Sequence, residues 1–117
     1  MEKIQLNVFA ITGDTFCVSA DDGEKVFKQI RLALDAGKKV ELSFLNIEML
    51  TSAFLNTAIG QLYGIEDENK IKSNLSVTEI SDDDKLLIKR VADTAREYYK
   101  DPDRFEKSIK KIMEDEG

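Results

Sequence analysis

Histidine is absent from this chain of 117 residues, and cysteine and proline each occur once. The lack of histidine removes the commonest general base, the commonest ligand of transition metals and every Ser-His or Cys-His nucleophile arrangement. The single cysteine, Cys17, cannot form a disulfide within the chain. We therefore expect a protein that is not an enzyme and holds no cofactor, although an enzyme built on carboxylates is compatible with this composition.

Long hydrophobic runs are also absent, since no stretch approaches the roughly twenty apolar residues that cross a bilayer. The opening stretch, MEKIQLNVFAITGDTF, alternates polar and apolar residues, which is not the pattern of a signal peptide. The net charge of −6 disfavours electrostatic attraction to nucleic acid or to an anionic membrane. We expect a cytoplasmic protein that binds neither nucleic acid nor membrane and has proteins or small molecules as partners.

A single domain is expected, because 117 residues with a hydrophobic share of 42% can bury one core. Polar and apolar residues alternate over 3–11, which predicts a half-buried strand. A turn at 12–14 and a short strand at 15–19 follow, and we expect the two strands to form a hairpin. Ser19 then precedes acidic residues and an apolar stripe at helical spacing, which predicts a helix that ends near Gly37.

The middle of the chain continues this alternation of strands and helices. Residues 40–45 are apolar on both sides, which predicts a central strand. Residues 52–63 carry the apolar face of a helix, and the polar stretch 65–74 is predicted to be an exposed loop. Residues 75–80 are rich in β-branched and aliphatic side chains and are predicted to form a further strand.

The last part of the chain is predicted to be helical. Ser81, followed by three aspartates, predicts the start of a helix that ends near Lys100, and Asp101 before Pro102 predicts the start of another. Residues 103–117 have a narrow apolar stripe, formed by Phe105, Ile109, Ile112 and Met113. We expect this stripe to pack on its own domain; the alternative is a contact with a partner or a second copy, which would give a homodimer.

Together these elements predict an α/β fold with a four-stranded mixed sheet flanked by helices. Residues 1–81 would form the α/β core, and residues 82–117 would form a C-terminal helical extension packed on the same domain. The predicted strand at 40–45 leads into the predicted helix at 52–63 through a short link, so that the free amides of the helix start point above the edge of the sheet. This junction is the candidate functional site.

Two interpretations of the junction follow from its residues. Thr51 or Ser52 is suited to cap the helix, which contributes about 1 kcal/mol to helix stability. A hydroxyl at the same place could also accept a phosphoryl group, whose two negative charges the helix dipole would favour. The stretch DDDK at 82–85 is better explained as a solvated helix start than as a cation site, because consecutive side chains on a helix diverge.

The stretch VELSFLNIEMLTSAFLNTAIGQLYG, residues 40–64, resembles the centre of a family of STAS-like domains of unknown function. This family is related to the STAS domains of sulfate transporters and of anti-sigma factor antagonists. Its members carry a strand of the type V-x-L-D-F-x-x-V, then a short link and a helix start of the type T-S-S-F. The chain matches this pattern at Val40, Leu42, Phe44, Ile47, Thr51, Ser52 and Phe54, and it has Ser43 where Asp is usual. The resemblance covers about the first eighty residues.

The resemblance implies a small α/β domain that works by docking proteins rather than by turning over a substrate. In the antagonists, the corresponding helix start binds an ATP-binding kinase of the histidine-kinase fold, which phosphorylates a serine there. In the most natural register that serine falls on Ala53, which has no oxygen to phosphorylate. The resemblance therefore favours a regulatory or adaptor role with docking over a phosphorylation switch.

The surface expected to dock the partner is the stretch 46–56. Its polar contacts would come from Asn46, Thr51, Ser52 and Asn56. The alternatives are a binder of a small anion or ligand, or a carboxylate-based enzyme, at the same helix terminus. A structural subunit that only dimerises is a third hypothesis.

Overall fold

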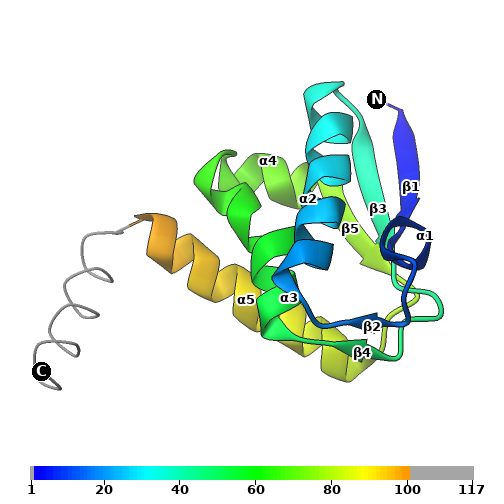
Figure 1. Cartoon of the computed structure of the whole chain (residues 1–117). Helices are drawn as coiled ribbons and strands as arrows, with labels where there is room; N and C mark the ends of the chain where they lie inside the picture. Colours follow the sequence, from blue (N-terminus) through cyan, green and yellow to red (C-terminus); the bar gives the residue numbers. More distant parts are fainter. Residues whose placement is uncertain (1, 101–117) are drawn as a thin grey trace, which may run out of the picture.

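The computed structural model describes residues 2–100, and three parallel strands form its main sheet. Strand β1 spans Lys3–Asn7, β3 spans Lys39–Ser43 and β5 spans Leu75–Thr78. The order is β1-β3-β5, so β3 is central, as the apolar pattern at 40–45 predicts (Figure 1). The predicted strand at 75–80 is likewise confirmed as β5.

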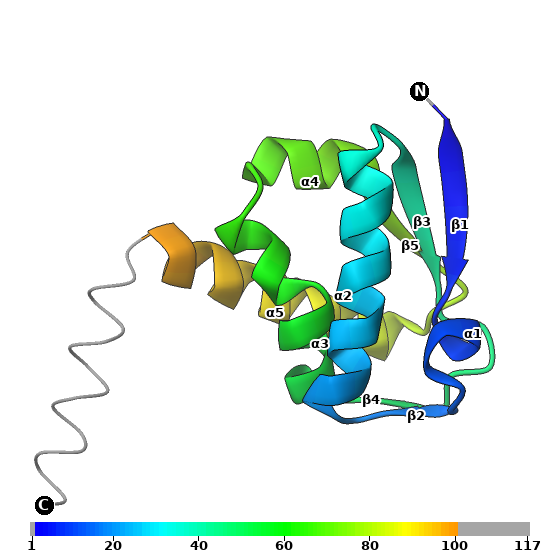
Figure 2. The ribbon, with the colours of Figure 1, turned by 45° about the horizontal axis from the view of Figure 1, so that its top comes forward.

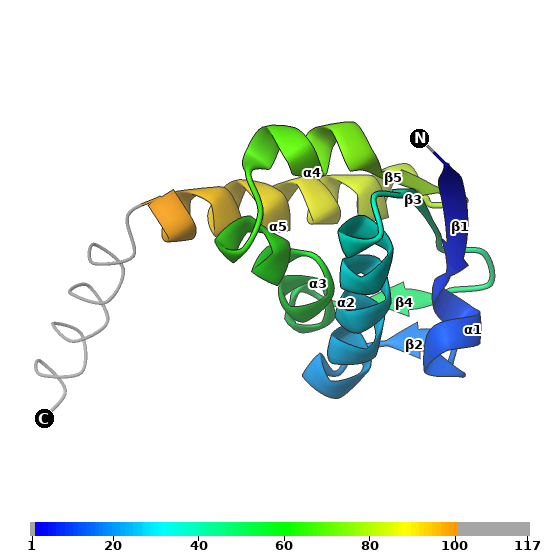
Figure 3. The ribbon, with the colours of Figure 1, turned by 90° about the horizontal axis from the view of Figure 1, so that it is seen from above.

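The two faces of this sheet differ in polarity. Ile4, Val40 and Leu75 are register partners, and their side chains share the face on which the helices lie. One residue further along, Gln5, Glu41 and Ser76 are also in register and lie on the opposite, polar face. Figure 3 shows helices α2 and α3 on one side of the sheet, which explains why only one set of side chains is buried.

A second, two-stranded sheet replaces the predicted hairpin. Strands β2, Phe16–Cys17, and β4, Met49–Leu50, pair in parallel, with Phe16 opposite Met49. The prediction that the strand at 15–19 pairs with the first strand is therefore wrong. The single four-stranded mixed sheet is not confirmed either, because the described residues form parallel sheets of three and of two strands.

A short helix, α1 (Val8–Thr12), interrupts the predicted strand at 3–11. The side chain of Asn7 accepts a hydrogen bond from the amide of Ala10 at 2.9 Å and so caps the helix. Gly13 ends it with a φ of 74°, and its amide donates to the carbonyl of Phe9. The alternation of polar and apolar residues continues past the end of β1. The strand nevertheless stops at Asn7, because the capping hydrogen bonds favour a helix there.

Helix α2 (Ala20–Asp35) follows its local signals closely. The Oγ of Ser19 accepts a hydrogen bond from the amide of Asp22 at 3.1 Å, which confirms the predicted cap. Gly37 adopts a φ of 77° after the last turn, as expected of a residue that ends a helix. Five buried side chains confirm the predicted apolar stripe; they are Val26, Phe27, Ile30, Ala33 and Leu34.

Helix α3 (Ser52–Ala58) and the 3₁₀ turn η1 (Gly60–Gly64) together cover the stretch predicted as one helix. Figure 2 shows α3 crossing in front of α5 and beside α2. The crossing with α2 is close at Gly23, where a Cβ atom would come within 2.5 Å of the carbonyl oxygen of Phe54. The predicted apolar face is buried, with Phe54, Leu55, Ala58, Ile59 and Leu62 in the core.

The predicted loop at 65–74 contains helix α4 (Glu68–Asn74), so that prediction is wrong for most of its length. The carboxylate of Asp67 caps this helix by accepting from the amide of Asn69 at 2.7 Å, and Ile71 is buried beneath it. The isolated apolar residue in a polar stretch concealed the helix, because one buried apolar side chain in two turns gives no visible stripe.

Helix α5 (Asp82–Lys100) begins and ends as predicted. The Oγ of Ser81 accepts from the amide of Asp84 at 3.2 Å, and the helix packs on α3 and η1 through Val91 and Ala95. No helix within residues 2–100 is long and apolar enough to cross a membrane. The predicted helix at 103–117, and with it the C-terminal part of the predicted extension, lies outside the described residues.

Candidate partner-binding site

The start of α3 is built around the hydroxyl group of Thr51. Its Oγ1 accepts a hydrogen bond from the amide of Phe54 at 3.2 Å, and it donates to the carbonyl of Val18 at 2.9 Å. Thr51 is half-buried. Through these two hydrogen bonds it caps the helix and ties the helix to the chain beyond β2. Because modification of the hydroxyl would remove the proton that it donates to Val18, we assign Thr51 the role of a structural cap rather than a free contact.

Ser52, Ala53 and Asn56 are exposed at the first turns of the same helix. Ser52 is the first helical residue, and Asn56 lies one turn further on, beside the shallow cavity between η1 and α5 that Gly60 and Ala95 also line. The buried neighbours Phe54 and Leu55 anchor the helix below. Within residues 2–100, α5 packs against α3 without covering Ser52, so a partner can reach this helix start.

Asn46 has a conformational role in the fold. It lies in the turn after β3 with a φ of 68°, and the amide of Ile47 donates to the carbonyl of Phe44 across that turn at 3.1 Å. Left-handed backbone of this kind is tolerated by asparagine and glycine and disfavours other residues. The structure thus gives Asn46 a conformational role, whatever its side chain contacts in a complex.

We expect Asn46→Gly to leave stability within about 0.5 kcal/mol of the parent, because glycine adopts a positive φ readily. Asn46→Val should lower the free energy of unfolding by about 1–2 kcal/mol, because a β-branched side chain resists this conformation. Urea denaturation measures both changes. Equal stability of the two variants would show that the turn relaxes without a left-handed residue.

The outer face of the β2–β4 sheet is apolar and exposed. Phe16 and Met49 are register partners with 46% and 49% of their surfaces exposed, and Val18, two residues after Phe16, is 42% exposed. Their neighbours Cys17 and Leu50 point the opposite way into the core. We call Phe16, Val18 and Met49 the apolar ribbon; it leads directly into the cap residue Thr51 and the exposed Ser52.

Carboxylates surround the apolar ribbon along the chain. Asp14, Asp21 and Glu48 flank its two strands, and the chain has no lysine or arginine over residues 4–24 or 40–69. One of these carboxylates, Glu48, accepts a hydrogen bond from the hydroxyl of Thr15 at 3.1 Å across the two strands. The ribbon is therefore an apolar surface with an acidic border, which is the composition of a surface that attracts a basic partner.

Sequence reasoning missed the apolar ribbon although its signal is present. In TFCVS, residues 15–19, apolar side chains fall on both sides of the strand, at Phe16 and Val18 on one and at Cys17 on the other. A strand of this kind is either covered on both faces or leaves one apolar face exposed. Only the tertiary structure distinguishes these cases.

Cys17 is fully buried and is not a nucleophile in this fold. Burial raises the pKa of its thiol to about 11, which keeps it protonated at neutral pH. The expectation of a buried structural thiol is thereby supported by geometry. Ser43, which stands where the family has Asp, is also buried, and its Oγ accepts from the amide of Leu45 at 3.4 Å.

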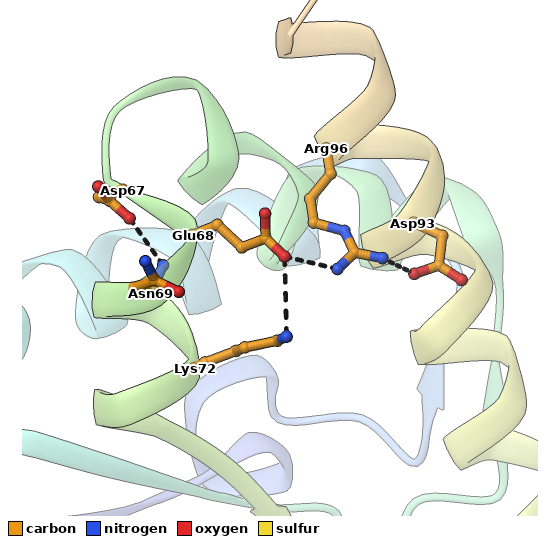
Figure 4. A network of polar contacts seen from close by, with 6 residues as sticks. All are labelled: Asp67, Glu68, Asn69, Lys72, Asp93 and Arg96. Atoms are coloured by element: carbon orange, nitrogen blue, oxygen red, sulfur yellow. Dashed lines mark hydrogen bonds and ion pairs between the residues drawn. The ribbon is translucent and has the colours of Figure 1, made fainter.

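An ion-pair network joins α4 to α5 on another side of the molecule (Figure 4). Arg96 donates to Glu68 at 2.6 Å and also to Asp93, one turn earlier in its own helix. The hydrogen bond lowers the pKa of the Glu68 carboxyl and raises that of Arg96, while burial raises the pKa of Tyr63 nearby. Because all three charges satisfy one another, we assign this network to the packing of α4.

Among residues 2–100, no group of three or more His, Cys, Asp or Glu side chains is arranged to hold a metal ion. The aspartates at 82–84 lie in the first turn of α5, as the prediction of a solvated helix start required. Neither Thr51 nor Ser52 lines the cavity between η1 and α5.

The fold and site define an α/β domain with an exposed apolar surface beside a helix start. The chain belongs to the family of STAS-like domains of unknown function, which matches residues 22–85. This match confirms the resemblance seen in the sequence and includes both α3 and β4. Neither curated proteins nor solved structures gave a match to the chain.

Proposed function

We propose that this chain is a non-enzymatic regulatory or adaptor domain that binds a protein partner through the apolar ribbon and the start of α3. The observation that carries the proposal is the exposure of Phe16 and Met49, side by side, next to the exposed Ser52. Large apolar side chains that cluster at a surface with a polar border are typical of protein interaction sites.

The chemistry of the surface suggests what the partner must present. Aromatic and methionine side chains are enriched at the centres of protein interfaces, where they fill apolar pockets. The acidic border formed by Asp14, Asp21 and Glu48 would attract lysine or arginine side chains around such a pocket. By its resemblance to the antagonist STAS domains, a candidate partner is an ATP-binding protein of the histidine-kinase fold in the cytoplasm.

The residues of the helix start divide into two roles under this proposal. Thr51 holds the helix in place through its two hydrogen bonds, and Ser52 and Asn56 are free to contact the partner. Docking in this manner needs no phosphoryl group, which agrees with alanine at position 53. For the alternatives, an anion binder or a carboxylate-based enzyme at this terminus, the cavity beside Asn56 offers no lining from Thr51 or Ser52.

We expect Met49→Asp and Ser52→Arg each to lower the recovery of the partner at least about tenfold in a quantitative affinity capture, because each places a charge within the contact. Ser52→Asp should do so as well, because it places a charged carboxylate within the contact that loses its water on binding. Capture of the tagged full chain followed by mass spectrometry measures these ratios. Melting temperatures close to that of the parent would show that the variants fold.

Matched controls place the same changes elsewhere on the surface. Leu32→Asp alters an apolar side chain that is 66% exposed near the end of α2, and Gln29→Arg adds a positive charge on the same helix. Both should retain the partner. If Met49→Asp and Ser52→Arg recover every protein at the parental level, the proposed surface is wrong.

A further inference from the structure

Lysine side chains gather at the edge of the main sheet where the strands begin. Lys3 starts β1, Lys39 starts β3, and Lys72 lies in the last turn of α4, just before β5. These starts share the upper end of the sheet in Figure 1, away from the apolar ribbon. The acidic chain therefore holds positive charge at one end of its sheet.

The register of β1 and β3 places two of these lysines directly opposite each other. Lys3 and Lys39 are Cα partners in neighbouring parallel strands, and both side chains are exposed on the polar face. Like charges in this position lower the stability of a sheet. Glu41 pairs with Lys3 at 2.7 Å and offsets part of this repulsion, whereas Lys39 has no ion pair within residues 2–100.

A cavity of about 260 Å³ opens between these strands and α4. Its polar lining consists of Lys3, Lys39, Lys72, Ser73, Asn74 and Ser76. The other two lining residues, Val40 and Leu75, are aliphatic, so no carboxylate lines the cavity itself. The three ammonium groups can only donate hydrogen bonds, and the two hydroxyls can donate as well, which suits an anion.

Internal ion pairs satisfy these lysines incompletely. Lys3 pairs with Glu41 at 2.7 Å, but Lys72 lies 3.8 Å from a Glu68 oxygen that Arg96 already holds at 2.6 Å (Figure 4). Within residues 2–100, the side chain of Lys39 makes no ion pair. Lys39 and Lys72 are thus available to a stronger anion.

We propose that this cavity binds the phosphate group of a small phosphorylated molecule or free phosphate. Lysine ammonium groups are common phosphate ligands, and a doubly charged anion would relieve the repulsion between Lys3 and Lys39. The volume lies below the roughly 300–1,000 Å³ of sites for larger ligands, so the site fits a phosphate group with a short substituent. This proposal is independent of the partner surface, which lies at the other end of the sheet.

The test uses the ¹⁵N-labelled full chain titrated with inorganic phosphate at constant ionic strength. We expect saturable amide shifts at 38–40 and 72–76, with a dissociation constant on the order of 1 mM. Lys39→Glu should weaken binding at least roughly tenfold, and it should fold because it places opposite charges across the register. Lys28→Glu makes the same charge change on the exposed side of α2 and should bind as the parent does.

Two outcomes would overturn the proposal: shifts that are spread over the surface or do not saturate, and equal binding by Lys39→Glu and the parent. Lys39→Gln gives a second measurement, because in phosphate-free buffer it should melt at the parental temperature or higher. A lower melting temperature would assign Lys39 a structural role instead. A titration with glycerol 3-phosphate distinguishes the two proposed ligands. If it binds more tightly than inorganic phosphate, the ligand is a phosphate ester; if it binds more weakly, the ligand is free phosphate.

Discussion

Gly23→Ala is expected to lower the free energy of unfolding by about 3 kcal/mol, because α2 and α3 touch at this residue. A Cβ atom there would lie 2.5 Å from the carbonyl oxygen of Phe54 and 2.9 Å from the Cβ of Thr57. The first of these atoms belongs to the backbone, so the two helices would have to separate to relieve the contact. The expected loss is a large share of the roughly 5–15 kcal/mol that stabilises a domain.

Gly60→Ala is the matched control for this substitution. Its Cβ would meet nothing closer than 3.7 Å, where the nearest atom is the Cβ of Ala95, and its backbone does not have a positive φ. We expect a change of less than about 0.5 kcal/mol, as for other substitutions away from special sites. Urea denaturation of both variants gives the comparison. A Gly23→Ala protein as stable as Gly60→Ala would show that α2 and α3 are not in close contact.

Phe54→Ala should destabilise the protein by about 3–5 kcal/mol, the range for removing a buried aromatic ring. Phe54 has no exposed surface and is among the largest fully buried side chains. It lies in the helix whose start we propose as the partner site, so its loss should also weaken partner binding by loosening that helix. The midpoint of urea denaturation and the recovery of the partner measure these two effects separately.

Phe16→Ala removes a phenyl ring of the same kind from the apolar ribbon, where 46% of the surface of Phe16 is exposed. We expect it to cost no more than about 1 kcal/mol of stability while lowering recovery of the partner. The two phenylalanines therefore separate folding from recognition. If Phe16→Ala destabilises the protein as much as Phe54→Ala does, the ribbon belongs to the core and not to an interface.

The helices with clear caps and wide apolar stripes could be predicted from the sequence. Ser19 and Ser81 accept the capping hydrogen bonds expected of them, and Gly37 takes the left-handed conformation that ends a helix. Such signals act within one turn of the chain, so they need no information about distant residues. The same is true of the central position of β3, which its apolar residues on both sides indicate.

Predictions failed where a strand's partner lies far away in the sequence and where the local pattern was mixed or weak. Phe16 pairs with Met49, 33 residues later, whereas the expected hairpin needed only a local turn. The alternation of residues 3–11 concealed α1, because Asn7 caps a helix within a pattern typical of strands. In α4, Ile71 alone is the buried aliphatic anchor, which leaves too weak a periodicity to identify the helix.

For the candidate sites, the sequence determined the chemistry of individual residues: the helix start at Thr51 and Ser52, the absence of histidine, and the long stretches without lysine or arginine. The tertiary structure alone decided which of them meet. Strand pairing set Phe16 beside Met49 and Lys3 beside Lys39, because register is fixed by the burial of one face of each sheet. That burial is a property of the whole domain, and no local pattern contains it.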